Sequence, residues 1–89
     1  MKYSIDFLLK AHNHCHSHKV EVLASEMCVC FYCQNTFSPN EIKEWFEESD
    51  GRVTAVCPKC NIDSVLGSKS GLPLTDKEFI DEMTEYFFS

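Results

Sequence analysis

The chain has 89 residues, 44% of them hydrophobic, six cysteines and a formal net charge of −6 at pH 7. This length leaves room for one small core, so we expect a single domain over residues 1–89. A core this small gives marginal stability, and such domains are commonly reinforced by disulfides, a metal or self-association. The negative charge repels nucleic acid and anionic membranes, which disfavours both as partners.

The first ten residues lack the features of a secretion signal, because Asp6 interrupts a short apolar run and no small-residue cleavage site follows. No stretch approaches the roughly 20 apolar residues that a membrane span needs. We therefore expect a cytoplasmic protein without a membrane anchor. Thiols stay reduced in that compartment, where paired cysteines favour a metal over disulfides.

Residues 1–27 are predicted to be helical, since they contain no glycine or proline. Apolar residues recur at three- and four-residue spacings over Ile5–Leu9 and again over Val20–Met27. The pattern allows one helix, or two helices broken near residues 14–17 with Ser17 as the second cap.

Residues 28–67 contain β-forming residues, paired cysteines and one strong helix signal. Cys28–Cys33 is predicted as a strand that turns through a metal knuckle. Ser38 then resembles an N-cap, with Pro39 at the first helical position and Glu41 completing a capping box. We expect a helix from there to about Glu48 that buries three side chains, those of Ile42, Trp45 and Phe46.

A turn at Asp50-Gly51 is expected to lead into a strand over residues 52–56. A short helix is predicted for residues 61–66, followed by a glycine- and serine-rich loop over residues 67–71. That loop lacks the residue order of a phosphate-binding loop and is interpreted as a turn or linker. Within residues 61–66, Asp63-Ser64 could form a polar pair near a metal, although helix capping is the simpler interpretation.

The last predicted element is a helix within residues 72–89, capped by Thr75 with Glu78 completing a second capping box. Its end carries three successive aromatic residues, Tyr86, Phe87 and Phe88. These cannot all face inward from one helix, so we expect at least one to dock on the N-terminal helix or on another subunit.

The most specific pattern in the chain is a pair of Cys-x-x-Cys motifs, Cys30/Cys33 and Cys57/Cys60. Two residues between cysteines let both sulfurs turn to one side, and two such pairs supply the closed tetrahedral set that Zn²⁺ prefers. We therefore predict one structural zinc ion on these four cysteines. Four thiolates leave no open position for water, so neither a catalytic metal nor a catalytic residue is assigned.

Two cysteines and four histidines lie outside this set. Cys28 could replace Cys30, because a Cys-x4-Cys spacing is also geometrically possible, but the shorter spacing favours Cys30. A second zinc site could combine Cys15 and Cys28 with two of the histidines, although both cysteines are also explained as buried inert thiols. The histidines, His12, His14, His16 and His18, have metal-chelating spacings, although a solvated polar patch is the favoured interpretation.

From Val22 to about Phe88 the chain resembles a group of small bacterial cytoplasmic proteins. The resemblance rests on Glu21-Val22-Leu23-Ala24-Ser25, Cys30-Phe31-Tyr32-Cys33, Pro39-x-Glu41-Ile42-x-x-Trp45, Thr54-Ala55-x-Cys57-Pro58-x-Cys60 and Ile62-Asp63-Ser64-Val65-x-Gly67-x-x-Ser70-Gly71. It implies a zinc-ribbon or treble-clef-like fold and carries no activity with it. Asn61 stands where that group has glycine, a position at which asparagine tolerates left-handed backbone.

A looser similarity connects Cys57-Pro58-Lys59-Cys60-Asn61 to the zinc knuckles of HNH endonucleases. Those enzymes place a general-base histidine between the knuckles, whereas this chain has no histidine after His18. Their phosphodiester chemistry therefore does not carry over.

The resulting expectation is a small α+β fold: a zinc lobe over residues 28–67 with a helix inserted between two knuckles, a helical segment over residues 1–27, and a C-terminal helix. The leading functional hypothesis is a non-catalytic structural-zinc module that binds a protein partner or self-associates. The alternatives are a nucleic-acid-binding zinc ribbon and a degenerate HNH-like nuclease or hydrolase. The hydrolase would pair Asp63 with a histidine from the N-terminal segment.

Overall fold

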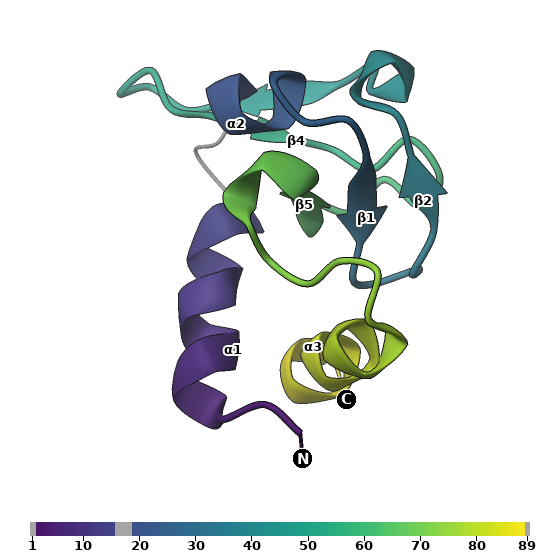
Figure 1. Ribbon diagram of the computed structural model, residues 1–89. Helices are drawn as coiled ribbons and strands as arrows, with labels where there is room; N and C mark the ends of the chain where they lie inside the picture. The colour runs from purple at the N-terminus through teal and green to yellow at the C-terminus, as the bar shows by residue number, and fades with distance from the viewer. Residues whose placement is uncertain (1, 16–18, 89) are drawn as a thin grey trace.

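The structure, a computed structural model, describes residues 2–15 and 19–88 (Figure 1). Its α-helices are α1 (Ile5–His12), α2 (Lys19–Leu23) and α3 (Lys77–Phe88). Its strands are β1 (Cys28–Cys30), β2 (Thr36–Phe37), β3 (Trp45–Glu47), β4 (Val53–Ala55) and β5 (Val65–Gly67). Single 3-10 turns cover Asn13–Cys15, Pro39–Glu41 and Ser68–Ser70. The predicted α+β class is therefore confirmed at this coarse level.

Two small antiparallel sheets organise the middle of the chain. Three strands are ordered β2-β1-β5, with Cys28 opposite Phe37 on one side and Cys30 opposite Val65 on the other. The second sheet is the β3–β4 hairpin, in which Trp45 lies opposite Ala55. The strands predicted within Cys28–Cys33 and within residues 52–56 are thus confirmed, as the shorter strands β1 and β4.

Strand β1 separates two apolar clusters, because successive side chains of a strand point to opposite faces. Cys28 and Cys30 belong to one cluster, and Val29 and Phe31 belong to the other. The first, the cysteine cluster, consists of Val22, Cys28, Cys30, Phe37, Ile42, Ala55, Cys57 and Val65. The second, the helical cluster, consists of Leu8, Ala11, Cys15, Val29, Phe31, Leu66, Leu74, Phe79, Ile80 and Met83. Figure 1 shows α1 and α3 on one side of the sheet, and α2 with the β3–β4 hairpin on the other.

The helical prediction for residues 1–27 is confirmed for α1 and α2, which form two separate helices. Ser4 begins α1, since its hydroxyl accepts a hydrogen bond from the Phe7 N–H at 3.1 Å. The predicted cap Ser17 lies outside the described residues. No helix in the described part of the chain combines the length and apolar character that crossing a bilayer requires.

The predicted helix between the knuckles is wrong. The capping box forms, with the Ser38 N–H donating to Glu41 Oε2 at 2.8 Å, but the helical turn ends at Glu41. Ile42 then takes an extended conformation with φ −72° and ψ 121°. Trp45-Phe46-Glu47 pairs with β4 across the turn at Gly51, whose φ is +89°. Hairpin pairing of β-forming residues six to ten positions apart thus outweighs a good start signal for a helix.

Two further predictions need correction. Residues 61–66 do not form a helix, because Val65 and Leu66 pair with β1 as part of β5. The final helix begins at Lys77, and Asp76 takes the role predicted for Thr75: its Oδ1 accepts a hydrogen bond from the Glu78 N–H at 3.0 Å.

Candidate metal centre

The first knuckle is closed by three hydrogen bonds to or from Cys30, each donated by a backbone N–H group. The Cys30 N–H donates to the Asn35 carbonyl at 3.1 Å, and the Gln34 N–H donates to the Cys30 carbonyl at 2.7 Å. The Tyr32 N–H points to Cys30 Sγ at 3.4 Å. Strand β1 thus delivers Cys30 into a tight loop whose amides face its sulfur.

The second knuckle repeats this pattern around Cys57. The Cys57 N–H donates to the Ile62 carbonyl at 2.9 Å, and the Asn61 N–H donates to the Cys57 carbonyl at 2.9 Å. The Lys59 N–H points to Cys57 Sγ at 3.4 Å. In both loops the hydrogen-bonding residues stand at the same positions relative to the first cysteine of the motif. The two Cys-x-x-Cys motifs therefore adopt the same conformation.

Each knuckle ends on a residue with left-handed backbone, Gln34 with φ 62° and Asn61 with φ 66°. This conformation turns the chain back on itself directly after the second cysteine of each motif. Asparagine adopts this left-handed conformation readily, whereas in glutamine the same conformation is sterically less favourable.

The two knuckles bring four sulfur atoms together. The Sγ atoms of Cys30, Cys33, Cys57 and Cys60 all lie within 4.8 Å of one another. Cys30 Sγ is 3.6 Å from Cys60 Sγ, and Cys33 Sγ is 3.7 Å from Cys57 Sγ. Zinc–sulfur bonds of about 2.3 Å in a tetrahedron place neighbouring sulfurs roughly 3.8 Å apart. The cluster therefore has the dimensions to hold one metal ion.

The electrostatics of the cluster favour a cation. Burial raises the pKa of the Cys30 thiol, and burial is also the largest cause of the raised pKa of Cys60. Burial acts the same way on Cys33, but hydrogen bonds from the backbone and side chain of Asn35 outweigh it and lower its pKa to about 7. Four close thiolates repel one another without a metal, whereas a divalent cation stabilises all four.

Ser64 is a neighbour of the cluster, which agrees with the alternative sequence-based interpretation of Asp63-Ser64 as a polar pair near a metal. Its side chain is buried, and its Oγ lies 3.2 Å from Cys30 Sγ. Its carbonyl accepts a hydrogen bond from the Phe31 N–H at 3.0 Å, which fixes the residue beside the first knuckle. The sequence-based interpretation of Asp63-Ser64 as a helix cap is therefore wrong, since Ser64 leads into a strand.

Cys28 and Cys15 lie outside the sulfur cluster. Cys28 is fully buried on the same face of β1 as Cys30, two residue pairs away in the ladder between β1 and β5. Cys15 is buried in the helical cluster, where burial and then the charge of Asp63 raise its pKa to about 12. Within residues 2–15 and 19–88, the four-cysteine cluster is the one group of three or more potential metal ligands. His16 and His18 lie outside the described residues.

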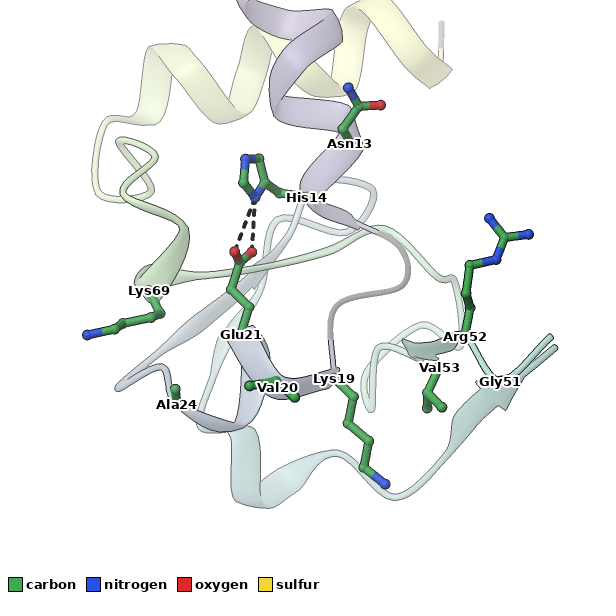
Figure 2. Close-up of a pocket in the computed structure, with 10 residues that line it drawn as sticks. All are labelled: Asn13, His14, Lys19, Val20, Glu21, Ala24, Gly51, Arg52, Val53 and Lys69. Atoms are coloured by element: carbon green, nitrogen blue, oxygen red, sulfur yellow. Dashed lines mark hydrogen bonds and ion pairs between the residues drawn. The ribbon is translucent and has the colours of Figure 1, made fainter.

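A groove of about 820 Å³ lies between α2, the β3–β4 hairpin and the segment after α1 (Figure 2). His14 faces Glu21 across it, with Nδ1 3.1 Å and 3.3 Å from the two carboxylate oxygens. Three cations, Lys19, Arg52 and Lys69, also line it.

These cations do not converge on one point. Figure 2 shows their side chains extending in different directions. Arg52 is paired with Glu48 and Asp50, each at 2.7 Å, and the Lys19 ammonium lies 5.4 Å from the centre of the Trp45 ring. The groove therefore offers no focused site for a compact anion.

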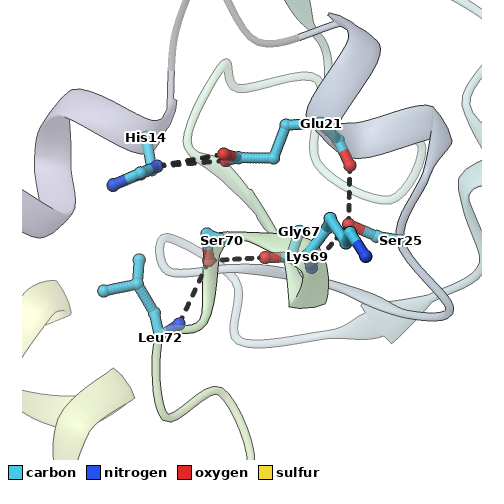
Figure 3. A network of polar contacts seen from close by, with 7 residues as sticks. All are labelled: His14, Glu21, Ser25, Gly67, Lys69, Ser70 and Leu72. Atoms are coloured by element: carbon cyan, nitrogen blue, oxygen red, sulfur yellow. Dashed lines mark hydrogen bonds and ion pairs between the residues drawn. The ribbon is translucent and has the colours of Figure 1, made fainter.

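The loop over residues 67–71 is attached to α2 by hydroxyl groups, as Figure 3 shows. Ser25 Oγ donates to the Glu21 carbonyl at 2.8 Å and accepts from the Lys69 N–H at 2.9 Å. Ser70 Oγ donates to the Gly67 carbonyl at 2.7 Å. The interpretation of this loop as a turn is confirmed, since Ser68–Ser70 form a 3-10 turn and Gly71 follows with φ 82°.

The hydrolase hypothesis pairs Asp63 with a histidine, and the structure gives His14 a different carboxylate partner, Glu21. His12 packs against the Phe87 ring, with 4.3 Å between ring centres. The expected docking of a C-terminal aromatic residue on the N-terminal helix is thus confirmed for Phe87.

A scan against protein-family models and searches of curated proteins and solved structures found no match. The assignment of the sulfur cluster as a metal centre therefore stands on its geometry and on the chemistry of its four thiols.

Proposed function

We propose that this chain is a structural-zinc module, in which one Zn²⁺ ion bound by Cys30, Cys33, Cys57 and Cys60 stabilises the fold and takes no part in catalysis. The observation that carries the proposal is the sulfur cluster, whose spacing of 3.6–3.7 Å between the knuckles matches a tetrahedral site. Four thiolates complete the coordination sphere and leave no position for water or substrate.

The position of the site supports a role in folding. Cys30 and Cys57 are fully buried members of the cysteine cluster, and Cys33 and Cys60 pack against it. A metal at this point joins the end of β1 to the loop between β4 and β5, adding to the contacts that Ser64 makes with Cys30 and Phe31. Zinc binding of order 10 kcal/mol is comparable to the whole stability of a small domain.

Serine substitutions with a matched control test the ligand set. Cys30→Ser is expected to lose the metal, because it removes one of the four thiolates. Cys28→Ser replaces an equally buried cysteine on the same strand face and is expected to retain one zinc per chain. Elemental analysis of both purified variants measures the difference. Zinc lost from Cys28→Ser and retained by Cys30→Ser would show that the ligand set is wrong.

We also propose that the folded module binds protein, either a partner or a second copy of itself. Several large apolar side chains are exposed, and such side chains supply the contact area of protein interfaces. Half or more of the side chain is exposed for Val20, Leu23 and Phe46, and somewhat less for Tyr32, Tyr86 and Phe88. The net charge of −6, which four thiolates and Zn²⁺ take to −8, argues against nucleic acid as the alternative partner.

Native mass spectrometry and affinity capture test this second part. We expect either a concentration-dependent dimer or a specific captured protein, and Phe46→Ser combined with Leu23→Ser is expected to weaken the contact. A monomer that captures nothing at micromolar concentration would refute protein binding and leave the structural-zinc assignment intact.

A further inference from the structure

The last turn of α3 lies against the first knuckle. Thr84 is the central contact: its Oγ1 donates to the Phe31 carbonyl at 2.5 Å and lies 2.9 Å from the Ile80 carbonyl of its own helix. The same oxygen accepts a hydrogen bond from Gln34 Nε2 at 3.0 Å. Phe31 lies between Cys30 and Cys33, and Gln34 directly follows Cys33. The Thr84 hydroxyl therefore bridges the start and the end of the knuckle loop.

Aromatic contacts extend this interface. The Phe88 ring centre is 5.6 Å from that of Phe31 and 4.8 Å from that of Tyr32. The Phe87 ring centre is 5.9 Å from that of Phe31. Both residues between Cys30 and Cys33 are therefore in contact with the end of α3, more than fifty positions away in the sequence.

The two knuckles differ in how the left-handed conformation of their last residue is stabilised. Asn61 belongs to a residue type that tolerates positive φ, whereas glutamine at the equivalent position 34 is under greater steric strain. Such a conformation persists where surrounding contacts over-determine it. The hydrogen bond from Gln34 Nε2 to Thr84 is a contact of this kind.

We propose that α3 clamps the first knuckle, with Thr84 as the positioning residue, and thereby sets the rate at which zinc leaves the site. This inference rests on the proposed zinc site and adds to it a part of the chain that contains no ligand. Cys33 and Cys60 are both partly exposed, and opening of the first knuckle would give a competing chelator access to the metal from the Cys33 side. Opening moves Phe31 and Gln34, and both are fixed to α3 through Thr84. Weakening the clamp therefore makes local opening of the knuckle more frequent, and zinc loss through the opened state becomes faster.

The test measures the rate of zinc transfer to a colorimetric chelator from the full-length, zinc-loaded protein. Thr84→Val removes the hydroxyl while keeping the side-chain volume, and we expect zinc transfer to become about fivefold faster or more, the effect of losing one typical hydrogen bond that holds the knuckle closed. Thr75→Val makes the same substitution at an exposed residue before α3 and is expected to transfer zinc at the wild-type rate. Gln34→Gly removes the same hydrogen bond together with the strain, so we expect a smaller effect than that of Thr84→Val.

A second variant separates clamping from general destabilisation. Leu8→Ala creates a cavity in the helical cluster without contacting the knuckle hydrogen bonds, and it is expected to lower the melting temperature more than Thr84→Val does. If Leu8→Ala accelerates zinc transfer as much as Thr84→Val, or if Thr84→Val transfers zinc at the wild-type rate, the clamp is refuted. Both results leave the zinc site in place, whereas failure to find zinc in the wild-type protein refutes the proposed function itself.

Discussion

Gln34 and Asn61 occupy the same position in the two knuckles, each one residue after the second cysteine, with φ angles of 62° and 66°. Each donates its backbone N–H to the carbonyl of the first cysteine of its motif, at 2.7 Å and 2.9 Å. The two loops therefore share one backbone conformation, and a metal bound between them would be held by equivalent halves.

Asn61 provides the simplest test of knuckle conformation. Asn61→Gly is expected to keep or raise the melting temperature, because glycine takes positive φ without steric cost. Asn61→Ala is expected to lower stability by about 1 kcal/mol, since alanine lacks the tolerance of asparagine for this region. Thermal unfolding of the zinc-loaded variants measures both, with Asn40→Ala at an exposed site as the control. Equal melting temperatures for the glycine and alanine variants would contradict the left-handed backbone conformation of residue 61.

Ser64 is expected to strengthen metal binding through Cys30. Its hydroxyl lies 3.2 Å from Cys30 Sγ, and a hydrogen bond to a metal-bound thiolate stabilises the charge on sulfur. Ser64→Ala should lower zinc affinity by roughly tenfold in a chelator competition assay. Ser49→Ala, at an exposed position in the β3–β4 turn, serves as the control. Unchanged affinity in Ser64→Ala would remove Ser64 from the metal centre.

Gly67 lies where no side chain fits. A Cβ atom at this position would be 2.4 Å from Ser25 Oγ and 3.2 Å from Ser25 Cβ. Gly67→Ala is therefore expected to destabilise the protein by about 1–3 kcal/mol. Replacing Ser25 with glycine in the same chain should recover part of that loss, because it removes both contacting atoms. Urea unfolding of the single and double variants measures how the two substitutions couple in the free energy of unfolding. If their effects on that free energy simply add, the predicted clash between Gly67→Ala and Ser25 is ruled out.

Tyr3 connects the N-terminal segment to the start of α3. Its hydroxyl donates to Asp76 Oδ2 at 2.5 Å, and this hydrogen bond, followed by burial and the charge of Asp76, raises the pKa of Tyr3. A phenol whose pKa is raised by folding stabilises the folded state below the unfolded pKa of about 10, and the contribution is lost as pH rises through the folded value. Ultraviolet titration should therefore find one tyrosine ionising late.

The Asp76→Asn variant checks the cause of this shift. It should return the late tyrosine toward pH 10 and reduce the difference in stability between pH 8 and pH 11. The measurement avoids the acidic range, in which protonation of thiolates would release a metal. A tyrosine that still ionises late in Asp76→Asn would show that the carboxylate is not responsible.

The cysteine motifs and the Ser38 capping box were predictable from sequence because their chemistry is local, whereas the cap predicted at Thr75 is taken by Asp76. Spacing alone brings two sulfurs to one side of a loop, and Ser38 does form its capping box with Glu41. The ends of the elements depend on distant residues instead. Phe46, predicted to be buried in a helix, is 57% exposed on a hairpin strand, because pairing with β4 is decided by residues on the far side of the Gly51 turn.

The contact between α3 and the first knuckle could not be predicted from the sequence either. Thr84 lies on a helix with a clear apolar pattern, and nothing near it in the chain marks it as the partner of Gln34. Only the docking of Phe79, Ile80 and Met83 into the helical cluster brings Thr84 to the carbonyl of Phe31. The grouping of the sulfurs could be predicted, but the surroundings that hold them could not.

The central claim is that one zinc ion on the four cysteines stabilises this fold. Its most direct test combines elemental analysis of the purified protein with thermal unfolding before and after metal removal under reducing conditions. We expect one zinc per chain, a cooperative melt in the loaded protein, loss of that melt in the metal-free protein, and its recovery when zinc is returned. A protein proven free of metal that melts at an unchanged temperature with unchanged cooperativity would contradict the account.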